Sequence, residues 1–181
     1  MKNVFKMAIV AIAAVTMSVA AQAQQAGDMA AGGHLAIGMG DNFTNVGIGG
    51  KFQYSVTDPI RIEGSLTFFL PKKEGVAGLS EAKLSFWDFC VNGHYLFPVS
   101  DQFTVYPLAG LGIQGWKSKY TGEFSSVLGG GSASGSDVCF NLGGGIDLKL
   151  TDVLFLNAEL KYRVVKNWDR FIISAGITYK F

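Results

Sequence analysis

Residues 153–166, VLFLNAELKYRVVK, alternate between apolar and polar side chains. Every second residue from Leu154 to Val164 is apolar or aromatic, and the positions between them include Asn157, Glu159 and Lys161. A period of two is typical of a β-strand, because successive side chains point to opposite faces. This stretch therefore predicts a strand with one apolar face and one polar, charged face.

The same alternation runs through the rest of the chain. Residues 60–70 and 169–181 repeat it closely, and three short polar turns, centred on Asp58, Asp101 and Asp152, separate alternating segments. A small polar residue followed by Asp is turn chemistry. Read outward from these turns, the sequence predicts eight strands: residues 34–40, 45–56, 60–70, 83–97, 102–117, 137–149, 153–166 and 169–181.

The connections between these strands alternate in length. Tight turns lie on one side, and the other side has longer segments, the longest being 71–82 and 118–136. An even number of strands joined up and down favours a closed meander. Short turns on one side and longer loops on the other are typical of outer-membrane barrels. The expected fold is all-β, an eight-stranded antiparallel up-and-down transmembrane β-barrel.

The volume of the side chains indicates which face is outside. An eight-stranded barrel has an interior only just wide enough for side chains to fill, so about five bulky residues per strand would overfill it. Glycines thin the polar face: Gly38, Gly40, Gly47, Gly49, Gly110, Gly112, Gly143, Gly145 and Gly176. We therefore expect the polar face inside and the apolar face against lipid. The alternative is a soluble lipid-binding barrel with the apolar face inside.

The N-terminus has the three parts of a secretory signal peptide. Lys2 and Lys6 precede an apolar run from Met7 to Val19, and Ala21-Gln22-Ala23 follows as an A-x-A cleavage site. The run is about 13 residues, shorter than the roughly 20 of a transmembrane helix. We expect a cleaved signal peptide over 1–23 and one barrel domain over 24–181.

Composition narrows the class of protein. Beyond the signal peptide no segment of 18 consecutive apolar residues occurs, which argues against a helical membrane protein. Without Lys2 and Lys6 the chain carries 13 basic and 14 acidic residues, a net charge of −1. This balance gives no electrostatic basis for binding nucleic acid.

Several segments carry a family resemblance: Asn157–Tyr162, Ala109–Gly112, Gly143–Gly145 and the terminal Tyr179-Lys180-Phe181. With the turn aspartates, they make the chain resemble the small outer-membrane protein β-barrel domain family, a porin-like group whose relatives include the OmpA membrane domain and OmpX. The resemblance implies a cell outer-membrane location and contact with outer-membrane lipid. It also implies that Tyr179 and Phe181 form the C-terminal signal read by the barrel-insertion machinery.

The polar face predicts a charged network in the lumen. Because an unpaired buried charge is costly, these groups should pair. Folding about Thr57-Asp58 could place Lys51 beside Glu63. The structural interpretation is a plugged, rigid lumen; the alternative is a narrow porin-like conduit for ions or small solutes. The expected members are Lys51, Arg61, Glu63, Asp88, His94, Asp147, Lys149, Glu159, Lys161 and Arg163.

Other chemistry-bearing residues are few. Cys90 and Cys139 face inward from strands that one strand separates, so they are either a disulfide or inert space-fillers. His94 should face Tyr106 as a hydrogen-bonded lumen histidine; a catalytic or metal role is the alternative. Pro107 falls inside a strand, where it should cause a bulge or a missing ladder bond. The spacing predicts no catalytic, cofactor or metal site.

These features favour a monomeric, non-enzymatic barrel that serves envelope structure or surface interaction. A surface partner would bind at loops 71–82 and 118–136. The tract 129–136, rich in Gly and Ser, should be flexible. The competing hypotheses are the narrow channel and an outer-membrane enzyme acting on lipid or peptide, which would need Ser, His and carboxylate groups to converge near the loops.

Overall fold

A computed structural model describes residues 25–40, 44–74, 81–121, 132–166 and 169–181. The expected signal peptide, residues 1–23, lies outside this part of the chain. The strands are β1 (Met29–Met39), β2 (Thr44–Thr57), β3 (Ile60–Glu74), β4 (Glu81–Tyr95), β5 (Phe97–Pro98), β6 (Phe103–Thr121), β7 (Ser132–Lys149), β8 (Leu154–Val165) and β9 (Arg170–Lys180).

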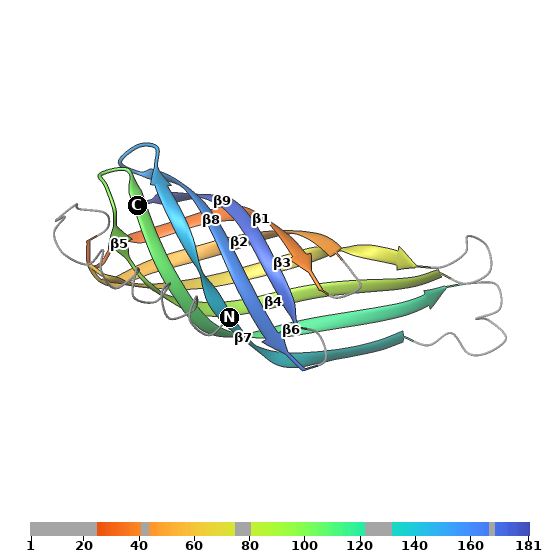
Figure 1. The fold of residues 1–181 in the computed structure, drawn as a ribbon. Helices are drawn as coiled ribbons and strands as arrows, with labels where there is room; N and C mark the ends of the chain where they lie inside the picture. The colour runs from red at the N-terminus through yellow and green to blue at the C-terminus, as the bar shows by residue number, and fades with distance from the viewer. Residues whose placement is uncertain (1–24, 41–43, 75–80, 122–131, 167–168) are drawn as a thin grey trace, which may run out of the picture.

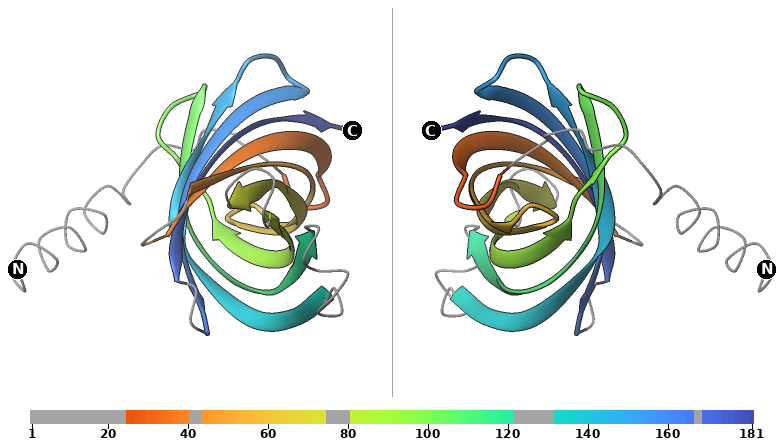
Figure 2. Two further views of the ribbon diagram at one scale, coloured as in Figure 1. Left: turned by 90° about the vertical axis from the view of Figure 1, so that its right-hand side faces the viewer. Right: turned by 90° about the vertical axis from the view of Figure 1, so that its left-hand side faces the viewer.

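The strands form one closed antiparallel barrel. β1 to β4 pair in chain order, as do β5 to β9, and β1 also pairs with β9 and β4 with β6, so the described strands leave no open edge (Figures 1 and 2). The two-residue β5 continues the line of β4, so the nine labelled segments form eight strands around the barrel. The expected eight-stranded up-and-down topology is confirmed. No helix in the described residues is long and apolar enough to cross a membrane.

The break between β4 and β5 lies opposite Pro107. His94 pairs with Leu108 and Phe97 with Val105 in one register, whereas the two intervening positions lack ladder pairs. Proline has no N–H to donate. On its other side Pro107 pairs with Gly144 in an unbroken ladder. Of the two predicted outcomes, the missing ladder bond is correct and no bulge forms there.

The barrel is apolar outside and polar inside, as the volume argument predicts. On β7 and β3, Leu142 is 67% exposed and Phe68 55%, whereas Glu63 and Arg61 are 0% and 1% exposed. The alternation persists along β8, where the burial pattern switches at every residue. The interpretation as a soluble barrel with an apolar interior is therefore wrong.

Several strands are longer than the sequence predicted. β1 begins at Met29 and not at residue 34, because its small residues pair with both β2 and β9. The Gly- and Ser-rich segment was predicted to be flexible, yet residues 132–136 belong to β7 and pair with residues 115–119 of β6. The partner strand supplies the hydrogen bonds that this composition does not favour by itself. Residues 129–131 lie outside the described chain.

The barrel wall is higher on one side. β3, β4, β6 and β7 have 15 to 19 residues, whereas β1, β2, β8 and β9 have 11 to 14. The longer strands extend past the others at the end opposite the tight turns (Figure 1). The predicted loops 71–82 and 118–136 are therefore partly strand, and their remaining segments connect the strands of the higher side.

Candidate functional site

The interior nearer the tight turns is organised around two carboxylates and a lysine. The ammonium of Lys51 lies 3.3 Å from Glu63 Oε2 and 2.8 Å from Glu159 Oε1, with all three side chains nearly fully buried. Lys51 lies on β2, Glu63 on β3 and Glu159 on β8. Buried charges are stable only when they are paired and hydrogen-bonded. Lys51 meets this requirement by linking β2 to both β3 and β8.

Glu159 has more partners than any other carboxylate described in the lumen. Lys161 donates to its Oε2 at 2.8 Å, and the hydroxyls of Tyr106 and Ser174 donate at 3.2 and 3.4 Å. These residues come from β8, β6 and β9. Glu159 therefore connects four strands together with Lys51.

A second ion pair lies beside this group. Arg61 donates from Nη1 to Asp147 Oδ2 at 2.6 Å, and its Nε donates to His94 Nδ1 at 3.2 Å. The guanidinium also lies over the Tyr106 ring at 4.7 Å, and that ring stacks on His94 with centroids 4.6 Å apart. The expected contact of His94 with Tyr106 is present, and it belongs to a continuous stack of Arg61, Tyr106 and His94.

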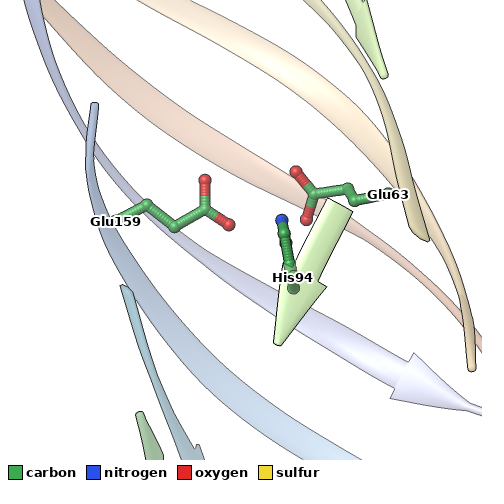
Figure 3. Close-up of side chains that lie close together, drawn as sticks. All are labelled: Glu63, His94 and Glu159. Carbon is green, nitrogen blue, oxygen red and sulfur yellow. The ribbon is translucent and has the colours of Figure 1, made fainter. Parts of the chain in front are cut away.

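Glu63, His94 and Glu159 converge like a metal site. One ligand atom from each lies within 4.8 Å of the others, and the side chains point toward one another from three strands (Figure 3). The donor set does not fit a metal ion. Lys51 already bridges the two carboxylates, and Arg61, a permanent donor, makes Nδ1 of His94 an acceptor. A neutral His94 then carries its proton on Nε2, which leaves that nitrogen no lone pair for a metal.

The interior nearer the loops holds a different set of charges. Asp88 pairs with Arg163, which also donates to Asn141 Oδ1 at 2.9 Å and to Cys90 Sγ at 3.1 Å. Arg170 lies 3.8 Å from the same carboxylate and donates to Gln114 Oε1 at 2.6 Å. Two guanidinium groups thus share one buried carboxylate.

Two apolar clusters pack among these polar networks. On the turn side Leu96, Tyr106 and Leu108 pack together and are buried. On the loop side the buried cluster contains Ala36, Phe69, Phe86 and Ile172, and Trp116 packs against it. Polar and apolar side chains together therefore fill the described interior of the barrel.

Cys90 and Cys139 are free, buried thiols that pack with Val165. Cys90 is on β4 and Cys139 on β7, and both pair with Gly112 of β6. Two strand spacings, about 9.6 Å, separate the backbones, whereas a disulfide needs Cα atoms closer than about 7 Å. The disulfide is therefore not formed, and the cysteines fill space over Gly112.

The predicted lumen residues are all inside except Lys149. It lies at the turn-side rim, where its ammonium pairs with Asp152 at 2.8 Å and its side chain is 34% exposed. Alternation places Lys149 on the inner face, but its position next to the turn takes it out of the network. The adjacent ammonium lowers the pKa of the exposed Asp152 carboxyl.

Arg170 is the main lumen residue that the sequence interpretation missed. It is 1% exposed on the inner face of β9. Its parity matches that of Ser174 and Thr178, which were assigned to the inner face, so the signal was present. The polar partners Gln53, Asn92, Gln114 and Asn141 are also buried, and neutral amides give no charge pattern to follow.

The predicted C-terminal signal residues lie on the outer face. Tyr179 is 54% exposed and Phe181 67% exposed, and the Phe181 ring packs against Phe52 with centroids 6.4 Å apart. The backbone N–H of Phe181 donates to the carbonyl of Met29 at 2.9 Å. Both aromatic rings are thus presented to the surroundings of the barrel at its turn-side end.

Comparison with known proteins agrees with a barrel that is apolar outside and polar inside. The outer membrane protein beta-barrel domain matches residues 8–181. The chain belongs to this family. Membership in the outer membrane protein beta-barrel family places the apolar belt of the barrel in an outer membrane. The resemblance expected from the sequence is confirmed.

Solved structures share the fold of this family member. Ail, the attachment invasion locus protein of Yersinia pestis, is 15% identical, with 87% of this chain and 100% of that chain covered and a TM-score of 0.60. Neisserial surface protein A is 18% identical over 85% and 96%, with a TM-score of 0.61. OprG of Pseudomonas aeruginosa is 14% identical over 88% and 98%, with a TM-score of 0.55. No curated protein sequence matches the chain.

Proposed function

We propose that this family member is a non-enzymatic, non-conducting outer-membrane barrel that serves as a rigid support for surface contacts made by its loops. The observation that carries the proposal is the filled interior. Ion pairs among Lys51, Glu63 and Glu159 cross the lumen, and apolar clusters pack between the polar groups. An eight-stranded barrel has little interior space beyond its side chains, so such packing leaves no continuous path for hydrated ions.

Conductance in planar bilayers tests the closed lumen. We expect no steady single-channel current in 1 M salt from purified, refolded protein whose folding has been checked by heat-modifiability on gels. A matched variant, Phe86→Ala, removes part of the loop-side apolar cluster. A steady, salt-dependent channel from the wild-type protein would favour the second candidate, a narrow porin-like conduit, for which the charged lumen is the supporting feature.

The surface role is supported by the higher side of the wall, from which the segments between β3 and β4 and between β6 and β7 connect. We propose that segments 71–82 and 118–136 contact a partner outside the cell. A structure of Ail was solved with the heparin analogue sucrose octasulfate, so a sulfated saccharide is one probe to test. Binding of this probe to intact cells, compared between the wild type and a variant with residues 75–80 and 122–131 replaced by Gly and Ser, would locate the contact. Equal binding by both would place the contact elsewhere.

The N- and C-terminal signals are part of the same proposal. We propose that residues 1–23 are removed on export, which N-terminal sequencing of the assembled protein would show as a start at Gln24. Phe181 is proposed as the residue read by the insertion machinery, supported by its exposed ring. Phe181→Ser should lower the yield of assembled barrel in cells and leave refolding in detergent unchanged. Equal losses in both assays would make Phe181 a packing residue only.

A further inference from the structure

Arg170 is the least satisfied charged group among the described lumen residues. Its side chain is fully buried, and its Nε and Nη1 atoms have no hydrogen-bond partner in the described chain. Only Nη2 is engaged, by the neutral Gln114 at 2.6 Å and by Asp88 at 3.8 Å. Buried polar groups are nearly always partnered, and a buried charge left short of partners is costly.

The charges around Arg170 do not balance. Arg163 takes the same carboxylate, Asp88, in a closer contact. Asp137, the other inward carboxylate at this level, is only partly buried and forms no ion pair among the described residues. The faces of Phe69 and Phe86, 4.6 and 5.7 Å from the guanidinium carbon, supply partial compensation by cation–π interaction. Arg170 therefore has no close carboxylate of its own among the described residues.

A second unpartnered group points to the same place. Asn45 is 6% exposed, and neither its amide nitrogen nor its oxygen has a partner in the described chain. Asn45 and Arg170 converge at Gly38 of β1. A Cβ built on Gly38 would lie 2.5 Å from Asn45 Oδ1 and 3.6 Å from Arg170 Nη1. Because residue 38 is glycine, the Asn45 carboxamide lies against β1 at this position, near Arg170 Nη1 and without a hydrogen bond to it.

We propose that Arg170 and Asn45 form a binding site for a small monovalent anion, a halide or a carboxylate, on the loop side of the lumen. The anion accepts hydrogen bonds from Arg170 Nη1 and from the Asn45 amide, whose oxygen and nitrogen can exchange places by a flip of the side chain. It supplies the negative charge that Asp88 alone does not provide. Its function is to complete the electrostatics of the loop-side interior and so to rigidify the base of the loops.

Specific anions should therefore stabilise the folded barrel. Refolded protein in detergent is unfolded by heat in sodium bromide, in sodium formate and in sodium gluconate at equal concentrations, so that general screening is the same. We expect bromide or formate to raise the unfolding midpoint by about 4 °C or more over gluconate, with saturation as the concentration increases. Bromide acting alone assigns a halide site, and formate acting alone assigns a carboxylate site.

Variants locate the effect. Asn45→Ala and Arg170→Gln should lose the anion-specific shift, whereas the control Lys180→Gln, at the turn-side rim, should retain it. If Arg170→Gln does not fold, Asn45→Ala and crystals of the wild type still test whether an anion binds at this site. Crystals grown in bromide should show an anomalous peak within hydrogen-bond distance of Arg170 Nη1. No peak, or equal midpoints in all three salts, would overturn the proposal.

Discussion

The two halves of the lumen solve the problem of buried charge differently. On the turn side three cations, Lys51, Arg61 and Lys161, face three carboxylates, Glu63, Asp147 and Glu159, and every one of the six is ion-paired. On the loop side Arg163 and Arg170 share Asp88. In the first half each charge has an ion-pair partner of its own, whereas in the second two guanidinium groups share one ion-paired carboxylate, and Arg170 lies against the rings of Phe69 and Phe86.

The difference separates two tasks of the interior. The balanced half joins β2, β3, β6, β7 and β8 near the tight turns, where the barrel must hold its shape. The unbalanced half lies beneath the loops, where an additional ligand can still enter the charge balance. The turn-side half therefore holds the barrel rigid, whereas the loop-side half can respond to a bound anion. Mutations in the two halves should have distinguishable effects on stability.

The largest effect is expected at Glu159. Glu159→Ala leaves Lys51 with one carboxylate and Lys161 with none among the described residues, and it removes acceptors from Tyr106 and Ser174. Breaking a buried ion pair from one side costs about 3 to 5 kcal/mol. Urea unfolding of refolded protein measures the loss. A decrease below about 1 kcal/mol would show that water reaches the lysines and that the turn-side interior is open.

Asp88→Asn tests the loop-side half. Arg163 loses its ion pair and Arg170 its nearest carboxylate, so we expect a loss of about 3 kcal/mol in the free energy of unfolding. The loss should be smaller in bromide or formate than in gluconate, because the anion replaces the missing charge. Glu159→Ala serves as the matched control, since its loss should not depend on the anion. An identical salt response of the two variants would remove the distinction between the halves.

A smaller effect is expected from added volume inside the barrel. A Cβ on Gly145 would lie 2.6 Å from Tyr106 Cζ, so Gly145→Ala must displace the ring that stacks on His94. Overpacking of this kind costs about 1 to 3 kcal/mol. Gly64→Ala is the control, because a Cβ there meets nothing within 4 Å and removes the entropy cost of a strand glycine. Equal stability changes in the two variants would contradict a tightly filled lumen.

The smallest effect is expected at the rim. The Lys149 ammonium lowers the pKa of the Asp152 carboxyl, so the pair stabilises the fold above the ordinary carboxyl pKa of 3.8 and loses this contribution as the pH falls below it. The pair is exposed, and Lys149→Gln should leave the urea midpoint at pH 7 nearly unchanged. A large loss would place Lys149 in the lumen network after all.

Alternation made the inner and outer faces predictable from the sequence, because a period of two survives any error in strand length. It could not give the partners. Lys51 and Glu159 are 108 residues apart, and only the closed barrel brings β2 opposite β8. Lys51 and Glu63 were within reach of prediction because a single tight turn relates their strands.

Position along the strand was the weaker part of the prediction. Lys149 and Arg170 both have inward parity, but one lies next to a turn and reaches water while the other lies under an aromatic cluster. The serine-rich start of β7 was missed for a related reason. Its pairing with β6 depends on backbone hydrogen bonds that any sequence can make, and local composition does not report them.

The seam between β1 and β9 bears on the kinetics of assembly. The other pairings join strands that are neighbours in the chain or, for β4 and β6, are separated only by the two-residue β5, whereas this one joins residues from opposite ends of the chain, such as Ala30 and Lys180. Closing so long a loop costs entropy before any contact repays it, which slows folding. Because β1 begins mainly with Ala and Gly, its pairing with β9 there depends on backbone hydrogen bonds. We therefore expect the pairing of β1 with β9 to be the slow, final step as the barrel enters the bilayer.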